Sequence, residues 1–313
     1  MPKSVVSGGA GFIGSNLVDR LVDDGHEVFV IDDLSSGSLG NLRGARQRGS
    51  VVLHQIDVAS TEVVDLVRSF QPNNVFHLAA QVDVRHSVAD PVYDAKINIL
   101  GTINMLEAAR HGNADRFVFS SSGGATYGDT FNIPTPESQP RVPASPYGVS
   151  KYVVEEYFRY YKDTYDLDYL SLGFANVYGP RQDPDGEAGV VAIFIGDLVA
   201  GRTPTIFGDG SQTRDFVFVE DVADALVRGA RIGGSRYLNI GTGVETSISG
   251  LYEHIVEATG ADIAPIMAAP KRGEQLRSCL DASAAKEHLS WEPWTTLDEG
   301  IAETVAWFRS LES

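Results

Sequence analysis

A glycine-rich turn near the start of the chain constrains its fold more than any other feature. Gly8, Gly11 and Gly14 follow the apolar pair at 5–6, and residues 15–24 have the pattern of a helix. A glycine turn that opens a helix presents backbone N–H groups, which bind a pyrophosphate. The sequence therefore predicts a strand–helix–strand unit that binds a dinucleotide.

Short apolar runs alternate with helical patterns through the first half of the chain. Further strands are expected at 28–31, 51–56, 75–78 and 117–120, with a helix at 63–70. This alternation predicts an α/β fold with a doubly wound parallel Rossmann sheet.

Beyond about residue 173 the pattern is less regular. Residues 176–189 read as a loop, short strands are expected at 214–219 and 237–240, and helices at 251–259 and 297–311. We expect a Rossmann domain over 1–173, completed by a returning segment at about 215–242. A smaller interleaved lobe is expected over 174–214 and 243–313.

The composition disfavours several classes of partner. A formal net charge of −17 argues against nucleic acid and anionic membrane surfaces, because both bind basic surface. No apolar run approaches the length of a membrane span. The single cysteine, Cys279, cannot form an internal disulfide, and the start of the chain enters a strand pattern directly. We expect a cytoplasmic protein and assign no metal site.

Two long helical patterns, at about 91–111 and 147–165, carry apolar or aromatic residues on more than one face. Each is expected to be covered by the sheet on one side. The other side is covered either by a second subunit or by a thick core of the same chain.

Tyr147 and Lys151 lie four residues apart, on one face of the second of these helices. An ammonium near a phenol favours the phenolate, so this Tyr can act as a base near neutral pH. Alone, such a pair is more often an exposed lysine and a surface aromatic. Downstream of the glycine turn, it indicates a base beside a bound dinucleotide.

Two aspartates that follow expected strands point to the adenosine. Asp32 can accept hydrogen bonds from the ribose hydroxyls and would repel a 2′-phosphate, which favours NAD over NADP. Asp57 and Val58 are placed to meet the adenine, although an aspartate after a strand is commonly a helix cap.

With these features the chain resembles the extended short-chain dehydrogenase/reductase family, in its nucleotide-sugar 4-epimerase branch, over essentially its full length. The motifs that carry the resemblance lie at 8–14, 32–37, 77–80, 120–128, 147–151, 176–181 and 208–219. The resemblance implies tightly held NAD and a hydride shuttle at C4 of a UDP-sugar. It also implies a homodimer that packs two long helices per subunit into a four-helix bundle.

The resemblance assigns a role to each residue of the reacting centre. Tyr147 would take the proton of the 4-hydroxyl, and Lys151 would lower the Tyr147 pKa and bind the nicotinamide ribose. A serine hydroxyl would bond the reacting oxygen. Ser122 is our choice and Ser121 the fallback, because related chains with a Gly-Gly-Ala variant carry one extra residue here. The remaining cofactor contacts that it implies are Phe12, Ile13, Ala79, Ala80 and Asn98.

The smaller lobe is implied to hold the UDP moiety. Asn176 and Arg214 match diphosphate contacts, and Glu274 matches a carboxylate on the uridine ribose. A phosphate-binding arginine of the family falls at Lys271 or the adjacent Arg272, of which we select Arg272.

Two departures from the family pattern bear on packing and substrate. Gly173 stands where relatives often have Arg, and we expect only local packing to change. Ser278 stands where a bulky residue in some members excludes N-acetylated sugars. The small side chain predicts a roomier pocket that accepts UDP-N-acetylglucosamine.

Other activities are weighed against the same residues. A 4,6-dehydratase needs an Asp-Glu pair where this chain has Gly123 and Gly124, and a GDP-fucose-type 3,5-epimerase needs a Cys and His pair that we do not find. UDP-glucuronate stays open as the substrate of an epimerase or decarboxylase, with Arg85 or Arg181 facing its carboxylate. A silent NAD-binding sensor is less favoured, since the Tyr and the Lys are both present.

Overall fold

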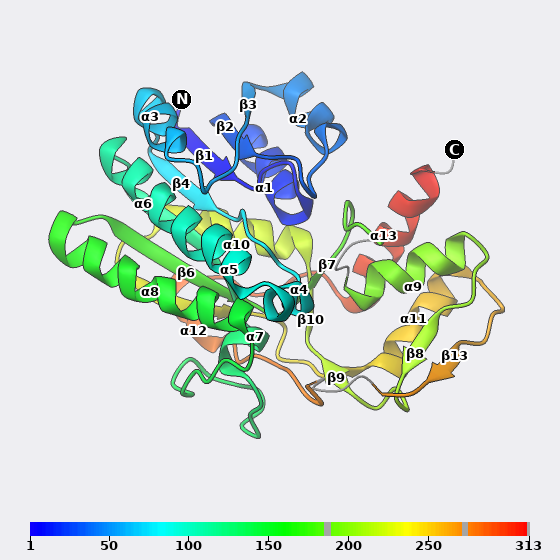
Figure 1. The fold of residues 1–313 in the computed structure, drawn as a ribbon. Helices are drawn as coiled ribbons and strands as arrows, with labels where there is room; N and C mark the ends of the chain where they lie inside the picture. Colours follow the sequence, from blue (N-terminus) through cyan, green and yellow to red (C-terminus); the bar gives the residue numbers. More distant parts are fainter. Residues whose placement is uncertain (185–188, 271–274, 312–313) are drawn as a thin grey trace.

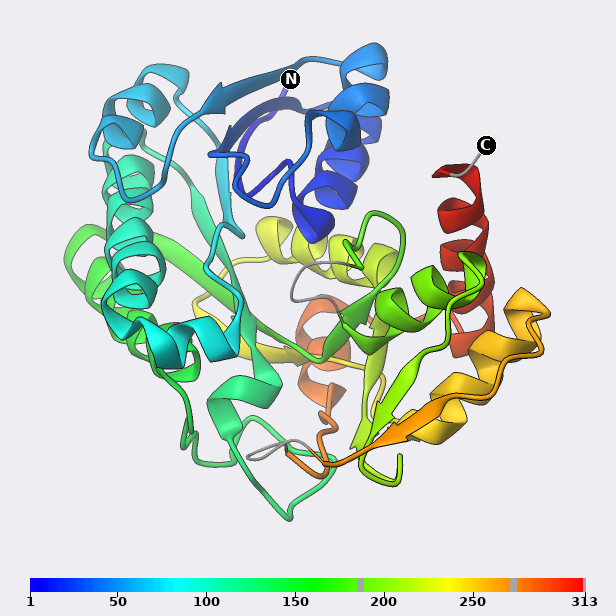
Figure 2. The same ribbon diagram turned by 45° about the vertical axis from the view of Figure 1, so that its right-hand side comes forward.

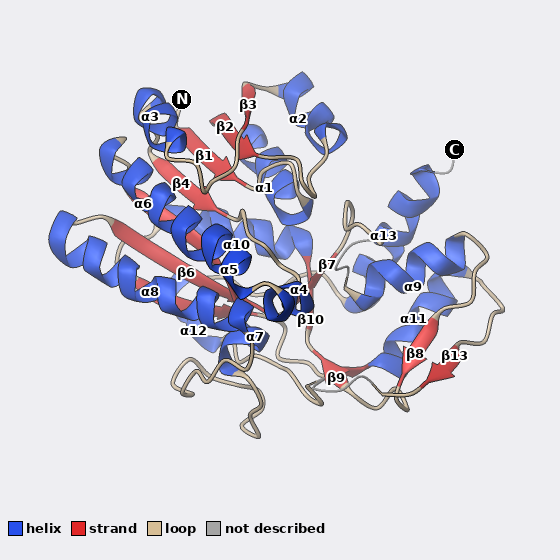
Figure 3. Cartoon of the chain, in the orientation of Figure 1, coloured by secondary structure: helices blue, strands red, loops and turns tan. Residues whose placement is uncertain are grey.

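A seven-stranded parallel sheet forms the centre of the molecule (Figures 1 and 3). The structure is a computed structural model and describes residues 1–184, 189–270 and 275–311. Across the sheet, the strands follow in the order β11 (Arg236–Ile240), β6 (Asp168–Phe174), β5 (Arg116–Ser122), β4 (Asn74–His77), β1 (Lys3–Ser7), β2 (Glu27–Asp32) and β3 (Val51–Gln55). Each neighbouring pair is parallel. The predicted fold class is confirmed.

Helices cover both faces of this sheet, because its strands are apolar on both sides. Val5 and Val6 are fully buried but enter opposite core clusters, as the two-residue period of a strand requires. One face is covered by α1 (Phe12–Asp23), α2 (Arg43–Arg48), α10 (Val219–Arg231) and α12 (Ser283–Leu289). The other is covered by α3 (Glu62–Phe70), α6 (Gly101–His111) and α8 (Pro146–Tyr165).

The strand order reverses next to β1, and this reversal places the site. The chain leaves β1 into α1 on one face, whereas it leaves the neighbouring β4 toward α6 on the opposite face. The two connections therefore part at the carboxyl ends of the strands and leave a crevice there.

Short elements complete this half of the molecule. They are η1 (Leu39–Leu42), α4 (Val84–Ala89), α5 (Pro91–Ala95), the π-helical turn η2 (Lys96–Leu100) and α7 (Gly123–Tyr127). The long helix predicted at 91–111 is thus a continuous run of α5, η2 and α6. No helix in the described part of the chain is long and apolar enough to cross a membrane.

A smaller lobe has its own apolar core beside the sheet (Figure 2). Its helices are α9 (Val190–Val199), α11 (Ile248–Thr259) and α13 (Leu297–Leu311). Three strand pairs accompany them: β7 (Asn176–Tyr178) with β10 (Phe216–Phe218), β8 (Thr205–Phe207) with β13 (Ile266–Ala268), and β9 (Thr213–Arg214) with β12 (Thr246–Ser247).

The packing departs from the expected domain boundaries in one segment. The segment at 215–242 supplies α10 and β11 to the sheet half. Yet α12 and Trp291, from the segment expected in the smaller lobe, also pack into the sheet-side core. The strand expected at 214–219 is interrupted at Asp215, and α10 already begins at Val219.

A buried carboxylate, Asp215, ties the returning segments together. Its oxygens accept hydrogen bonds from the backbone N–H groups of Thr242, Gly243 and Leu280 and from the Thr242 hydroxyl. The loop after β11 and the segment before α12 therefore meet at the junction of β9 and β10.

The side chain of Tyr237 occupies the space beside Gly173. Gly173 lies in β6 and pairs with Asn239 of β11 on one side and Ser121 of β5 on the other. A Cβ at Gly173 would lie 1.8 Å from the hydroxyl oxygen of Tyr237. A side chain at position 173 therefore has no room beside the Tyr237 ring in this chain.

We predict that Gly173→Ala lowers the free energy of unfolding by about 2 kcal/mol, because the added methyl overpacks the β6–β11 contact. Thermal melts should show the loss, and Gly233→Ala should match wild type, since a Cβ there meets nothing within 4 Å. In a Tyr237→Ala background the cost should shrink. An equal cost in both backgrounds would rule out Tyr237 as the cause.

Candidate active site

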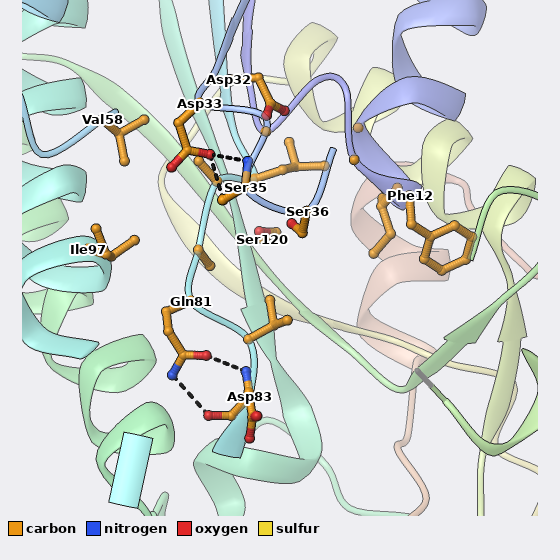
Figure 4. A pocket seen from close by; sticks show the side chains of 18 of the residues that line it. Phe12, Asp32, Asp33, Ser35, Ser36, Val58, Gln81, Asp83, Ile97 and Ser120 are labelled. Atoms are coloured by element: carbon orange, nitrogen blue, oxygen red, sulfur yellow. Dashed lines mark hydrogen bonds between the residues drawn. The ribbon is translucent and has the colours of Figure 1, made fainter. Parts of the chain in front are cut away.

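A cavity of about 550 Å³ opens at the carboxyl ends of β1, β2, β4 and β5, where the strand order reverses (Figure 4). Twelve of the thirteen cofactor residues predicted from the sequence line it. They are Gly8, Gly11, Phe12, Ile13, Gly14, Asp32, Asp57, Val58, Ala79, Ala80, Tyr147 and Lys151.

The glycine turn is shaped by close backbone contacts. Gly8 has a φ of +70°, and a Cβ there would lie 2.7 Å from the backbone nitrogen of Ala79. A Cβ at Gly14 would lie 2.0 Å from the carbonyl oxygen of Gly8. These two glycines are required by the fold of the turn itself.

Gly11 is different, because the protein leaves room beside it. A Cβ there would meet only the Gly8 carbonyl oxygen, at 3.3 Å. Gly11 is the N-cap of α1, and no side chain caps the helix at this end. Uncapped N–H groups at a helix N-terminus attract an anion, so the turn fits the pyrophosphate of a dinucleotide.

Asp32 lines the cavity beside the glycine turn (Figure 4). Its carboxylate accepts hydrogen bonds from the N–H of Ala10 and the N–H of Leu34, both at 2.9 Å. Burial raises the Asp32 pKa, while these backbone bonds lower it. Because a carboxylate oxygen can accept two hydrogen bonds, capacity remains for the hydroxyls of a ribose.

Two predicted cofactor residues are also used by the local fold. Asp57 lines the cavity but accepts a hydrogen bond from Ala59 N–H at 2.8 Å, in a turn ahead of α3. Asn98, the thirteenth residue, does not line the cavity. Its amide oxygen accepts from Gln81 N–H and its amide nitrogen donates to the Gln81 carbonyl, both at 2.9 Å. Asn98 therefore holds the cavity wall at Gln81.

The start of α8 places Tyr147 and Lys151 at the other end of the cavity. Pro146 at the first turn and Ser145, whose hydroxyl accepts from Gly148 N–H, fix where the helix begins. Lys151 is buried, and its ammonium donates to the Ser120 carbonyl at 2.8 Å.

Burial dominates the ionisation of both groups. It lowers the pKa of Lys151 to about 7, against the charge of Asp94, which raises it. It also raises the pKa of Tyr147 to about 12, against a hydrogen bond with Ser122, which lowers it. Lys151, from which we expected a lowering of the Tyr147 pKa, is not among the causes of the Tyr147 shift, and the charge of Asp94 raises the Tyr147 pKa further. With the protein's own groups alone, Tyr147 is therefore a neutral phenol at neutral pH.

The two candidate serines differ in what their hydroxyls contact. The Ser122 hydroxyl, at the end of β5, accepts from Ala125 N–H at 3.4 Å and is near enough to Tyr147 to lower the pKa of that phenol. The Ser121 hydroxyl instead donates to Glu155 at 3.5 Å, although Ser121 lines the cavity and Ser122 does not. Successive residues of a strand face opposite sides, and the geometry therefore favours Ser122 as the partner of Tyr147.

The predicted substrate residues lie in the smaller lobe, outside the cavity lining. Asn176 is exposed at the start of β7, and its N–H donates to the Asp215 carbonyl, next to Arg214. Ser278 N–H donates to the Thr213 carbonyl, so Ser278 and Arg214 sit on neighbouring segments. Lys271, Arg272 and Glu274 lie outside the described residues.

Ser278 also faces the reacting centre. Its hydroxyl oxygen is 3.2 Å from the position of a Cβ built on Gly124, two residues after Ser122. Of the two arginines considered for a sugar carboxylate, Arg85 is exposed on α4, whereas Arg181 lines the cavity and pairs with Asp19 at 2.5 Å.

Several lining residues were not predicted as site residues. Ser35 and Ser36 belong to the quoted motif at 32–37, and Gln81 follows the motif at 77–80, so extending these motifs would have found them. His86 and Tyr93 carried no such signal. Among residues 1–184, 189–270 and 275–311, no group of three or more His, Cys, Asp or Glu side chains could hold a metal ion.

Comparison with known proteins places this site in context. The sequence pattern of the family described as GDP-mannose 4,6 dehydratase matches residues 5–304. The chain is 50% identical over 309 residues to a UDP-glucose 4-epimerase of Mycolicibacterium smegmatis. The matched region covers 98% of this chain and 99% of the relative.

Two solved structures are close in fold and length. A UDP-N-acetylglucosamine 4-epimerase from Methanobrevibacter ruminantium, in complex with UDP-N-acetylmuramic acid, is similar with a TM-score of 0.94 and 35% identity, over 99% of both chains. A UDP-glucose 4-epimerase from Thermus thermophilus, in complex with NAD, has a TM-score of 0.90 and 40% identity, over 98% of this chain and 99% of that one.

We predict that Gly11→Ala and Gly14→Ala separate ligand binding from folding. Gly11→Ala should change the free energy of unfolding by less than about 1 kcal/mol, yet weaken NAD binding by about tenfold or more, because the methyl enters the space of the pyrophosphate. Gly14→Ala should lower both, since its methyl meets backbone. Calorimetric NAD titration and thermal melts measure the two quantities. Unchanged NAD affinity in Gly11→Ala would exclude this turn as the phosphate site.

Proposed function

We propose that this chain is an NAD-dependent 4-epimerase of UDP-sugars. The chain belongs to the GDP-mannose 4,6-dehydratase family of extended short-chain dehydrogenases/reductases, in its nucleotide-sugar epimerase branch, and the proposal proceeds from this membership. The observation that carries the proposal is the presence of Tyr147 and a buried Lys151, 5.9 Å from the Tyr147 ring, in the lining of a cavity that also contains the glycine turn and Asp32. The names of the similar proteins support the same reaction and cofactor.

Each reacting side chain has one task in the proposed reaction. Tyr147 takes the proton of the sugar 4-hydroxyl as C4 loses its hydride, and returns it to the oxygen when C4 regains hydride on its other face. Ser122 donates a hydrogen bond to that oxygen, and Lys151 binds the nicotinamide ribose. When bound, NAD supplies the hydride acceptor and a positively charged ring, which favours the phenolate of Tyr147.

The dehydratase reaction fits these residues less well, despite the family's description. Elimination of water needs an acid and base pair beside the hydroxyl residue, where this chain has Gly123 and Gly124. A Cβ at Gly123 would lie 2.5 Å from the side chain of Leu280. The position therefore has neither the proton carriers nor room for them.

We further propose that the sugar pocket accepts N-acetylated hexoses as well as glucose and galactose. Ser278 is small, and it faces Gly124, which has no side chain. A similar solved structure is a UDP-N-acetylglucosamine 4-epimerase. UDP-glucuronate has less support, because Arg85 lies outside the cavity lining and Arg181 is already paired with Asp19.

The contacts to UDP remain proposals on the smaller lobe. Asn176 and Arg214 lie on either side of the junction at Asp215. The N–H of Asn176 donates to the Asp215 carbonyl, and the N–H of Thr242 donates to the Asp215 carboxylate. A planar guanidinium such as that of Arg214 can bind a phosphate with two parallel hydrogen bonds. Arg272 and Glu274 keep their predicted roles without a structural description.

A homodimer is proposed from the exposed apolar side chains of the long helices. Val92 is 79% exposed and Leu100 54% on the helical run at 91–111, while Tyr157 and Tyr160 are exposed on α8. These two helical runs lie side by side on one face of the molecule (Figure 1). An isologous four-helix bundle would cover both, and a monomeric mass in solution would contradict it. The cytoplasmic location stays a prediction.

The experiment that tests the function is incubation with NAD and one UDP-sugar at a time, followed by NMR of the anomeric protons. UDP-glucose and UDP-N-acetylglucosamine should each give the signal of the C4 epimer, without added reductant. Ser278→Tyr should abolish the reaction of the N-acetylated sugar and keep that of UDP-glucose. No new signal from these sugars or from UDP-glucuronate would refute a UDP-sugar epimerase and favour another nucleotide sugar or a silent protein.

Ser122→Ala should slow turnover by roughly 10²–10⁴-fold, because the variant loses the hydrogen bond to the reacting oxygen. Bound NAD should stay at the wild-type level, measured by absorbance after release from the protein. Ser121→Ala is the matched control, and its rate should stay within about threefold of wild type, since its hydroxyl contacts Glu155. A full rate in Ser122→Ala with a slow Ser121→Ala would reverse the assignment.

A further inference from the structure

A buried carboxylate, Asp94, lies behind the reacting pair and takes no part in the steps described so far. It sits on α5, next to the π-helical turn η2, and its exposed fraction is 0%. Burying a carboxylate costs several kcal/mol unless hydrogen bonds and opposite charge compensate. The groups that compensate the buried Asp94 carboxylate therefore indicate its role.

Three side-chain donors surround Asp94. Its Oδ1 accepts from Gln81 Nε2 at 3.2 Å and from Asn98 Nδ2 at 2.9 Å. Its Oδ2 accepts from the Ser150 hydroxyl at 2.6 Å. All three partners are donors, so both carboxylate oxygens of Asp94 act as acceptors.

These hydrogen bonds connect two walls of the cavity. Gln81 lines the cavity after β4, and Ser150 precedes Lys151 on α8. The Asp94 carboxylate thus links the loop that carries Gln81 to the helix that carries both Tyr147 and Lys151. A π-helical turn such as η2 is frequent at functional sites.

Most of the groups that face the Lys151 ammonium carry no negative charge. The Ser120 carbonyl and the ring of Phe119, 4.6 Å away, face it from β5, and the ring of Tyr147 lies 5.9 Å away on its own helix. His77 of β4 is neutral, since burial lowers its pKa to about 3. Asp94, from α5, supplies the negative charge that raises the pKa of Lys151.

We propose that Asp94 is a positioning residue that holds α8 against the Gln81 loop through Ser150 and brings a buried carboxylate to the helix that carries Lys151. The proposal rests on the proposed function only for its activity readout. The charge of Asp94 acts on the ionisation of Lys151, whereas its hydrogen bond to Ser150 acts on the position of the helix.

Asp94→Asn and Ser150→Ala separate these two effects. Asp94→Asn keeps the size of the side chain and an acceptor oxygen but loses the charge. Ser150→Ala loses the hydrogen bond and keeps the charge. Without the charge, Lys151 has a lower pKa, and because it is a base, its ammonium is lost at lower pH.

The test is the pH profile of kcat/KM for UDP-glucose with the NAD-loaded enzyme. The alkaline limb should move to lower pH by about one unit or more in Asp94→Asn, and stay within about 0.3 units of wild type in Ser150→Ala. Profiles that coincide for wild type and Asp94→Asn would overturn the proposal. Equal shifts in both variants would overturn it too, because they would show a structural effect alone.

A direct titration of Lys151 guards against a variant that does not fold and against a wrong assignment of function. The chain has six lysines, so lysine labelled with ¹³C at Cε gives a small set of NMR signals, and Lys151→Arg identifies the one of interest. In NAD-loaded wild type that signal should be that of an ammonium at pH 6, below the Lys151 pKa of about 7. A neutral amine at pH 6 would overturn the proposal, whether or not any UDP-sugar reacts.

Discussion

The close approach of the β1–α1 turn to the end of β4 is the contact on which the rest of the structure depends. With Gly8 in a left-handed conformation, its backbone lies against that of Ala79, so the two strand ends meet without side chains between them. This contact brings the start of α1 and the residues after β4 to one crevice. The cavity, its helix N-terminus and the buried lysine all follow from the same edge of the sheet.

The second half of the site is assembled from segments far apart in the sequence. Asp215 gathers the loop after β11 and the segment before α12 around β9, and Ser278 reaches Gly124 across this junction. A buried carboxylate with several backbone donors fixes such a junction more sharply than apolar contact, because an unmade hydrogen bond in the interior is costly. The positions of the residues proposed to bind the substrate thus depend on Asp215, a carboxylate that is itself buried.

The sequence was enough to predict the glycine turn, the sheet and most of the cavity, because these follow from local patterns and ordered motifs. It was not enough for β6, whose strand character depends on remote partners: Ser171 donates to Glu155, and Gly173 makes room for Tyr237. It missed α9 and α10 as helices, and the interruption at Asp215 between β9 and β10. Asn98 was expected at the cofactor, but its amide is used by Gln81. A single sequence motif does not show which neighbouring group will use a side chain's hydrogen bonds or its space.

The interleaving of the two lobes sets the order in which the protein can be completed during synthesis. The strand β11 enters the sheet beside β6 only after the chain has passed through β7, α9, β8 and β9 of the smaller lobe. While the chain is made from its N-terminus, β6 remains an open edge until residues 236–240 have emerged from the ribosome. The cofactor half therefore cannot close its sheet as an early, self-contained unit. The first segment of the smaller lobe must already be present when the sheet closes, whereas α11 and α13 follow later in the chain.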